Sequence, residues 1–405
     1  MELSSAGPPL GAGPERTAMN STAESVVLSA EPTSLVNADA AADRRADLEK
    51  KQARIANLLQ QVGCDGLLIL DPDNFAWLTG GAAARGVVDP AEFPALYYSA
   101  DQRWVVTSNV DSQRLFDEEL DGLGFQLKQW PWHGDREQLL ADMCHGRAIA
   151  CDRSRSGLKS VSEPLRRLRR ALTPYEQACL RAVGAIVSHA LEATCRNLAP
   201  NESEREAAGQ LHHRLVHRGA QPVLVEAAAD GRSRRYRQCG YTAVAIQRYG
   251  VLNVTARKYG LCVTASRSFC FGEPDATFRK EHAAACKVSA TYIASSWPDA
   301  MPRQILATGR HIYQLTGFEH EWRLCPQGYV TGRAPVELKL TPQTEELLQA
   351  DWAVTWYGSV GAACSCDTFL ISSEGPVSAT PTEVWPLKRL RVQGAEFLLP
   401  DLLLR

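Results

Sequence analysis

The chain has 405 residues, of which 45% are hydrophobic and 22% charged, and its formal net charge at pH 7 is −2. This length suits two domains, and the composition provides enough apolar residues for a buried core. A nearly neutral chain has no global electrostatic attraction to nucleic acid or to an anionic membrane. No run approaches the length of apolar sequence that spans a membrane. We therefore expect neither nucleic acid nor membrane as a partner.

The Cys residues and the N-terminal sequence bear on the cellular compartment. The twelve Cys are scattered without a regular spacing, and the N-terminal segment lacks the basic and apolar regions of a secretory signal. Both features predict reduced thiols and a cytoplasmic protein.

The first part of the chain divides into two segments by composition. Residues 1–43 are rich in Ala, Ser, Pro and Gly and lack an apolar period, which predicts a disordered tail. After it, a helical pattern that ends at Gly63 is followed by alternating short strands and helices. This alternation predicts a small α/β domain over 44–165.

A second domain is predicted over 166–390, and its first helix has a clear start. Thr173 and Glu176 have the spacing of a capping box, and Pro174 stands at the first helical position. The pattern then runs helix, helix, strands twice over, which predicts an α+β domain and hints at an internal duplication. Residues 391–405 are predicted to be a C-terminal tail.

Four segments of these domains resemble one known family. They are "DNFAWLTG" (73–80), "LTPYEQACLRAVGAIV" (172–187), "YGLCVTASRSFCFGEP" (259–274) and "CDTFLISSEGP" (366–376). The sequence resembles the creatinase, aminopeptidase P and prolidase family, the pita-bread metallopeptidases, over roughly 44–385. The resemblance implies a pita-bread C-terminal domain, a smaller creatinase-type α/β domain before it, and a homodimer.

The family holds two divalent metals with two Asp, one His and two Glu, and the matching positions here carry other residue types. The five positions are Asn253, Thr264, Arg333, Tyr357 and Cys366. Asn and Thr are neutral and offset no charge on a dication, and Arg has no lone pair to donate. We therefore expect that the metal site is lost and that the protein has no metal cofactor.

The segment 253–269 is predicted to be a β-hairpin with Gly260 at its turn. If Arg257 faces Gly260, then Asn253 lies directly opposite Thr264, with about 5 Å between their Cβ atoms. Two Asp residues at these places would hold a cation between them.

Several further residues are candidates for a site. Gln238 stands near the place of the family's substrate-facing His, and Glu337 is a second candidate on the substrate side. Arg333 is expected to fill the former metal space, paired to Asp367, Asp230 or Glu337. Cys366, with Cys364, is interpreted as a buried inert thiol, because no base that would activate it is apparent in the sequence.

Three functions stay open at this point. The first is a binding or regulatory homologue without metallopeptidase activity, whose pocket takes a small peptide-like or amidine-like ligand. The second is a metal-free hydrolase that uses Arg333, Tyr357 or His320 together with Asp367. The third is an active Xaa-Pro aminopeptidase.

Overall fold

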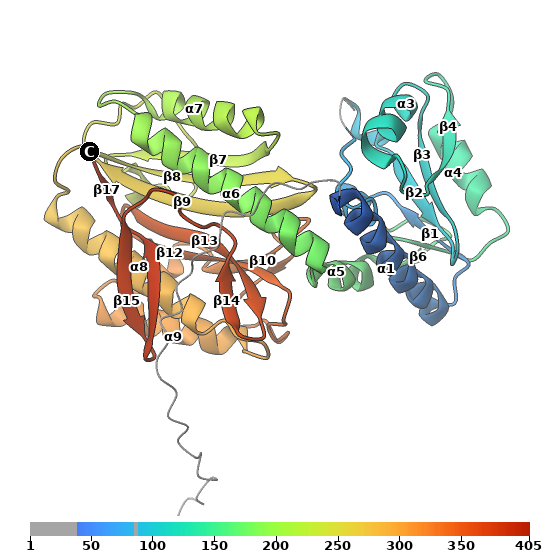
Figure 1. The fold of residues 1–405 in the computed structure, drawn as a ribbon. Coiled ribbons are helices and arrows are strands. Elements are labelled where there is room, and N and C mark those ends of the chain that lie inside the picture. Colours follow the sequence, from blue (N-terminus) through green and yellow to red (C-terminus); the bar gives the residue numbers. More distant parts are fainter. Residues whose placement is uncertain (1–38, 85–87) are drawn as a thin grey trace, which may run out of the picture.

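A computed structural model describes residues 39–84 and 88–405. Two domains lie side by side, joined through the long helix α6 (Pro174–Asn197) (Figure 1). The expected tail over 1–43 falls mostly outside the described residues, but its last five residues do not fit the prediction. Helix α1 already begins at Asp39, because the sequence there is rich in Ala, the strongest helix former. No described helix has the length and apolar character needed to cross a membrane.

The N-terminal domain is a mixed six-stranded sheet in the order β4-β3-β2-β1-β5-β6, with an apolar core on each face. Asp71 caps helix α2 by accepting hydrogen bonds from the backbone N–H groups of Asp73 and Asn74. The strands are β1 (Gly66–Ile69), β2 (Ala95–Tyr98), β3 (Arg103–Ser108), β4 (Gln126–Trp130), β5 (Ile149–Cys151) and β6 (Lys159–Ser160). The helices are α1 (Asp39–Val62), α2 (Pro72–Leu78), α3 (Ser112–Arg114), α4 (Arg136–Cys144) and α5 (Ser162–Arg170).

The C-terminal domain places two sheets face to face, each covered on its outside by a helix pair (Figure 1). Helices α6 and α7 (Glu204–His217) cover the first sheet, which contains β7 (Gln221–Ala229), β8 (Tyr249–Lys258) and β9 (Leu261–Cys270). Helices α8 (Ala276–Ala294) and α9 (Pro302–Leu315) cover the second sheet, which contains β10 (Gly328–Thr331), β11 (Leu338–Lys339), β12 (Ala353–Val360), β13 (Ala363–Ser372) and β14 (Gly375–Ser378). The predicted α+β class, with a smaller α/β domain before it, is confirmed.

The predicted tail over 391–405 is instead part of the C-terminal domain. Strands β15 (Leu387–Val392) and β16 (Ala395–Pro400) form a hairpin, and β17 (Leu403–Leu404) pairs in parallel with the end of β9. Leu399 and Leu402 belong to the buried core, where they pack in the same cluster as apolar residues of α8 and of the second sheet. The proposed boundary at 165/166 lies within α5, where Leu165 packs into the N-terminal core.

The β8–β9 hairpin forms as predicted, but its register differs. Tyr259 and Gly260 both have positive φ, 53° and 66°, so they are the two turn residues. Lys258 therefore pairs with Leu261, Asn253 faces Ser266, and Thr264 faces Thr255. The shift is two residues, which keeps Asn253 and Thr264 on the same face, as diagonal rather than direct neighbours.

Candidate functional site

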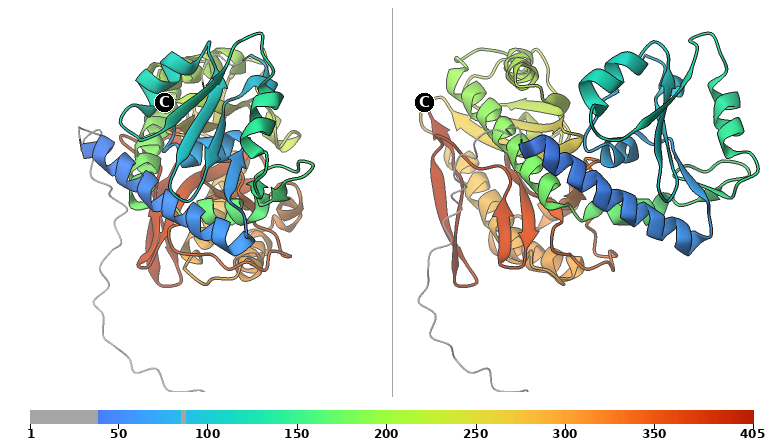
Figure 2. Two further views of the ribbon diagram at one scale, coloured as in Figure 1. Left: turned by 90° about the vertical axis from the view of Figure 1, so that its right-hand side faces the viewer. Right: turned by 45° about the vertical axis from the view of Figure 1, so that its right-hand side comes forward.

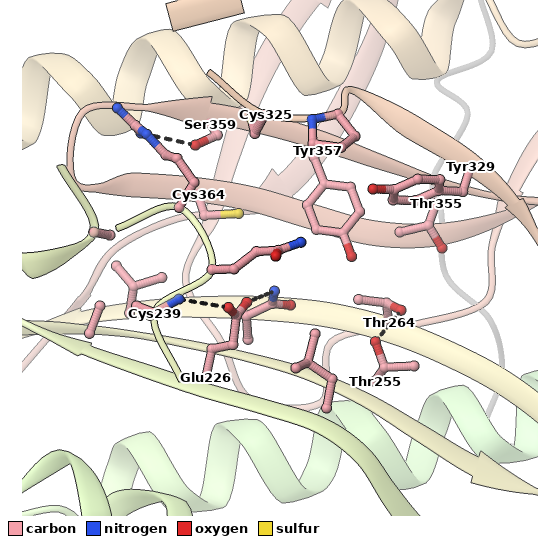
Figure 3. A pocket seen from close by; sticks show the side chains of 18 of the residues that line it. Glu226, Cys239, Thr255, Thr264, Cys325, Tyr329, Thr355, Tyr357, Ser359 and Cys364 are labelled. Carbon is pink, nitrogen blue, oxygen red and sulfur yellow. Dashed lines mark hydrogen bonds between the residues drawn. The ribbon is translucent and has the colours of Figure 1, made fainter. Parts of the chain in front are cut away.

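A cavity of about 230 Å³ lies between the two sheets of the C-terminal domain. Figure 3 shows its two walls, with β12 and β13 on one side and β7, β8 and β9 on the other. We call it the central cavity. Its walls contain Val223, Leu224, Glu226, Ala228, Ser233, Arg237, Gln238, Cys239, Val251, Asn253, Thr255, Thr264, Cys325, Pro326, Tyr329, Pro335, Val336, Thr355, Tyr357, Ser359, Ala362, Ala363 and Cys364.

Threonine hydroxyls join the two sheets beside the central cavity. The Oγ1 atoms of Thr255 and Thr264 lie 2.8 Å apart, and Figure 3 marks this hydrogen bond with a dashed line. The hydroxyl of Thr368, on β13, donates to the carbonyl of Thr264 at 2.9 Å and accepts from its N–H at 3.1 Å. Because that donation uses its only hydrogen, the hydroxyl of Thr355, 2.9 Å away, donates to Thr368. A neutral hydroxyl network therefore connects the sheets.

Among the described residues that line this cavity, Glu226 is the one carboxylate. It lies on β7 opposite Asn253, and its Oε2 accepts from the Asn253 Nδ2 at 2.8 Å. Its Oε1 accepts from the backbone N–H of Cys239 at 3.0 Å. The Oδ1 of Asn253 is buried without a hydrogen-bond partner. The cavity thus presents acceptor oxygens that the protein itself satisfies only in part.

Two tyrosines stand on the opposite wall. Tyr329 on β10 and Tyr357 on β12 pack edge to face, with 5.9 Å between their ring centroids. Burial, followed by the neighbouring thiol of Cys366, raises the pKa of Tyr357 well above its usual range. Burial also raises the pKa of Tyr329. Both phenols are therefore neutral at physiological pH and act as hydrogen-bonding groups.

The thiols at the cavity are protonated too. Burial raises the pKa of Cys364 to about 12 and that of Cys366 well above the usual range. Cys366 pairs with Tyr357 across the β12–β13 ladder, is fully buried and does not line the cavity. Because a thiolate is needed for nucleophilic attack, these thiols are suited to packing and not to catalysis.

The structure brings together four of the residues singled out from the sequence. Asn253, Thr264, Tyr357 and Gln238 all line the central cavity, and they come from β8, β9, β12 and the loop after β7.

Arg333 is the largest departure from expectation. It does not line the cavity, and its partner is none of the acids proposed for it. Its Nη2 lies 2.5 Å from Oε1 of Glu176, and its Nη1 donates to the carbonyl of Tyr259 at 2.6 Å. Arg333 lies just after the end of β10, beyond the cavity. Its side chain extends into the interface between the domains, where it forms an ion pair with Glu176 at the start of α6.

The other three candidates also lie elsewhere. Glu337 is buried against Arg169, with an N–O distance of 2.9 Å. Asp367 points from β13 to Arg267, also at 2.9 Å. The side chain of His320 is 71% exposed on the short helix Glu319–Arg323, beside Glu321. Arg333, Tyr357, His320 and Asp367 therefore do not converge on one site, as metal-free hydrolysis would require.

Comparisons with known proteins agree with this fold. Residues 178–333 match the sequence profile of metallopeptidase family M24. The matched segment lies in the C-terminal domain, and the chain has the pita-bread fold of the creatinase, aminopeptidase P and prolidase family. No curated protein matches the sequence.

Solved structures align with nearly the whole described part of the chain. The Xaa-Pro dipeptidase from Bacillus anthracis matches with a TM-score of 0.69 at 16% identity, over 83% of this chain and 99% of that one. The prolidase from Pyrococcus horikoshii OT3 matches with a TM-score of 0.71 at 16% identity, over 82% and 99%. The N-terminal domain of FACT complex subunit SPT16 from Cicer arietinum matches with a TM-score of 0.63 at 11% identity, over 84% and 96%.

The described residues of the central cavity do not fit a pair of divalent metals. Within the described part of the chain, no three His, Cys, Asp or Glu side chains gather closely enough to hold an ion. The wall of the central cavity contains one carboxylate, Glu226, and no His. Neutral hydroxyls and phenols cannot offset the charge of two dications, which need several oxygen anions around them.

Among the residues of the central cavity that sequence reasoning missed are Tyr329 and Glu226. The His position was assigned to Arg333, which follows Gly332, but Tyr329 follows another glycine of the same segment, Gly328. It is Tyr329 that enters the cavity. Glu226 had a local signal as well, since it is the only acid within the apolar strand 221–229.

Proposed function

We propose that this M24-family protein is a metal-independent binding or regulatory homologue whose central cavity takes a small peptide-like ligand. The observation that carries the proposal is the donor set of the cavity. Hydroxyls of Thr255, Thr264 and Thr355 and the phenols of Tyr329 and Tyr357 stand there, with a single carboxylate. These groups form hydrogen bonds to a polar ligand, but they neither activate water nor hold a dication.

The closed shape of the domain supports the same proposal. In a dinuclear peptidase, metals and their carboxylates contribute to holding the two hairpins together. Here the hydroxyl of Thr368 connects β9 with β12 and β13. This hydroxyl network is a link between the sheets that needs no ion, which supports the proposal. The solved domain of a FACT complex subunit has a similar fold, so this fold also occurs in a protein that is a subunit of a complex.

Metal analysis and peptidase assays test the proposal directly. The purified chain is incubated with Mn²⁺, Co²⁺ or Zn²⁺, desalted, and analysed for bound metal, with a prolidase treated in parallel as the positive control. We expect no stoichiometric metal and no hydrolysis of Xaa-Pro dipeptides or tripeptides. Retention of one or two metal ions per chain, or metal-dependent turnover, would overturn the proposal in favour of an active Xaa-Pro peptidase.

A further inference from the structure

The carboxylate of Glu226 is buried without an opposite charge. Only 7% of the residue is exposed, and among the described residues no ion pair to it occurs within 4.0 Å. It accepts two hydrogen bonds, from neutral N–H groups of Asn253 and Cys239. A buried charge without a counter-charge is costly, so such a group usually has a partner.

Asn253 adds a second unsatisfied acceptor at the same place. It is 8% exposed and lines the cavity, and its Nδ2 is committed to Glu226. Its Oδ1 therefore remains without a donor. Both side chains need hydrogen-bond donors from within the cavity, and Glu226 needs positive charge as well.

Arg237 does not provide that charge. Although it lines the cavity, its Nη2 lies 2.7 Å from Oε2 of Glu321, and its Nη1 donates to the carbonyl of Gly361 and to Ser359. Glu321 thus neutralises Arg237. Among the described residues of the cavity wall, Glu226 and Arg237 are the only acidic or basic side chains, so Glu226 is left without a counter-charge there.

The rest of the cavity suits an organic ion more than a hydrated inorganic one. Tyr329 and Tyr357 line the cavity, and an aromatic ring attracts a cation because the face of the ring is electronegative. Val223, Leu224 and Val336 form an apolar rim and are 43%, 44% and 40% exposed. Such a rim packs against the carbon skeleton of a ligand.

We propose that the central cavity binds an organic monocation, an ammonium or amidinium group on a small apolar body, whose N–H groups are held by Glu226 and Asn253. This inference rests on the proposed function, since it names the ligand class of the same metal-independent cavity. The cation donates to Glu226 and to Oδ1 of Asn253, while its apolar part lies against the tyrosines and the rim.

Calorimetric titration with matched probes tests the proposal. Benzylamine and benzamidine are the cations, and benzyl alcohol and benzamide are their uncharged counterparts. We expect each cation to bind at least about tenfold more tightly than its counterpart. Glu226→Gln should remove this preference without weakening the uncharged probes. Glu383→Gln, at an exposed acid outside this cavity, is the matched control and should leave all affinities unchanged.

A second variant keeps the test independent of Glu226. Glu321→Gln leaves Arg237 without its counter-charge, so we expect about tenfold weaker binding of the cations and unchanged binding of the neutral probes. The melting temperature of each variant is measured to confirm folding. Equal affinity for charged and uncharged probes, no binding of either cation at millimolar concentration, or equal competition by ammonium chloride would each overturn the proposal. The metal content of the same sample is measured as well. Bound metal would contradict the proposed function, whereas failure to prefer cations in a metal-free sample would contradict only this ligand class.

Discussion

At the scale of single residues, one cluster of buried charges lies at the domain interface. Glu176, at the start of α6, is fully buried and lies 2.8 Å from Lys51 of α1 and 2.5 Å from Arg333. Lys51 also reaches Asp47, at 2.6 Å. Removing one member of such a cluster leaves the others buried and unpaired, which costs far more than losing an exposed pair.

The acid dependence of stability is one consequence. Burial acts to raise the pKa of Glu176, but Lys51 and Arg333 outweigh it and hold the pKa at about 2. Because this lies below the ordinary value of 4.5, ionised Glu176 stabilises the fold above about pH 4.5, and that contribution is lost as the pH falls toward 2. We predict that Glu176→Gln destabilises the protein at neutral pH and that the deficit shrinks on acidification.

Urea unfolding of wild type and variant at neutral pH and near pH 3 measures this difference. Glu273→Gln, whose side chain is 78% exposed, serves as the control and should change the free energy of unfolding by less than about 1 kcal/mol at either pH. A deficit of Glu176→Gln that stays constant with pH would contradict the prediction.

The hydroxyl network gives a second prediction at this scale. Thr368→Val keeps the side-chain shape but leaves the backbone N–H and carbonyl of Thr264 and the hydroxyl of Thr355 without their partner. We expect a loss of about 2–4 kcal/mol in the free energy of unfolding. Thr308→Val, at an exposed threonine of α9, should cost less than about 0.5 kcal/mol. Equal effects of the two substitutions would show that the network contributes little.

At the scale of elements, the tip of the β8–β9 hairpin also belongs to the domain interface. A Cβ at Gly260 would lie 2.7 Å from Cβ of Ala76 in the N-terminal domain and 2.8 Å from Nη1 of Arg333. Gly81 approaches the backbone of Tyr259 from the other side, where a Cβ would come within 2.4 Å of its carbonyl oxygen. The turn therefore needs glycine for its conformation and for its contact with the other domain.

Comparing two glycines separates these requirements. Gly394 occupies the turn of the β15–β16 hairpin with φ of 86°, and its Cβ would meet nothing within 4 Å. We predict that Gly394→Ala costs about 1–2 kcal/mol of unfolding free energy through backbone strain alone. Gly260→Ala should cost about 1–3 kcal/mol more, because it also overpacks the interface. Similar losses in denaturant unfolding of the two variants would argue against a close contact at the tip.

The hairpin illustrates what local sequence can and cannot predict. Alternating apolar residues around Gly260 identify two strands and a turn. The register depends on which two residues adopt positive φ at the turn. The expected register puts Lys258 and Tyr259 there, whereas the structure has Tyr259 and Gly260. In the sequence, only the preference of such turns for glycine at the second position distinguishes the two registers. Asn253 and Thr264 were correctly placed on one face, but their partners across the strands were not.

At the scale of the whole molecule, buried ion pairs hold the domains in one arrangement. Lys51 joins α1 to α6, and Arg169 connects Asn74 of the N-terminal domain with Glu337 of the C-terminal one. Figure 2 shows from two further directions how α1 lies along the start of α6. We therefore expect the two domains to unfold together. Assembly into a homodimer, by contrast, stays a prediction from the family resemblance.

Calorimetric unfolding tests this coupling. Wild type should show one transition, and the double variant Lys51→Met/Arg169→Met should show two, because each domain keeps its own core when the interface is weakened. Arg310→Met/Arg389→Met removes two exposed cations as a control and should keep a single transition. One unsplit transition in the interface variant would mean that apolar contacts couple the domains.

The sequence by itself indicated the family resemblance through its motifs and the two-domain α+β architecture through its periodicity. The neutral character of Asn253, Thr264 and Tyr357 follows directly from their residue types. Only the tertiary structure decided where charges go. Arg333, Glu337 and Asp367 found partners far away in the sequence, at Glu176, Arg169 and Arg267. An ion pair depends on distances between elements, which no local pattern encodes. For the same reason Glu226, a single acid in an apolar strand, became notable only when the folded chain left it buried without a counter-charge.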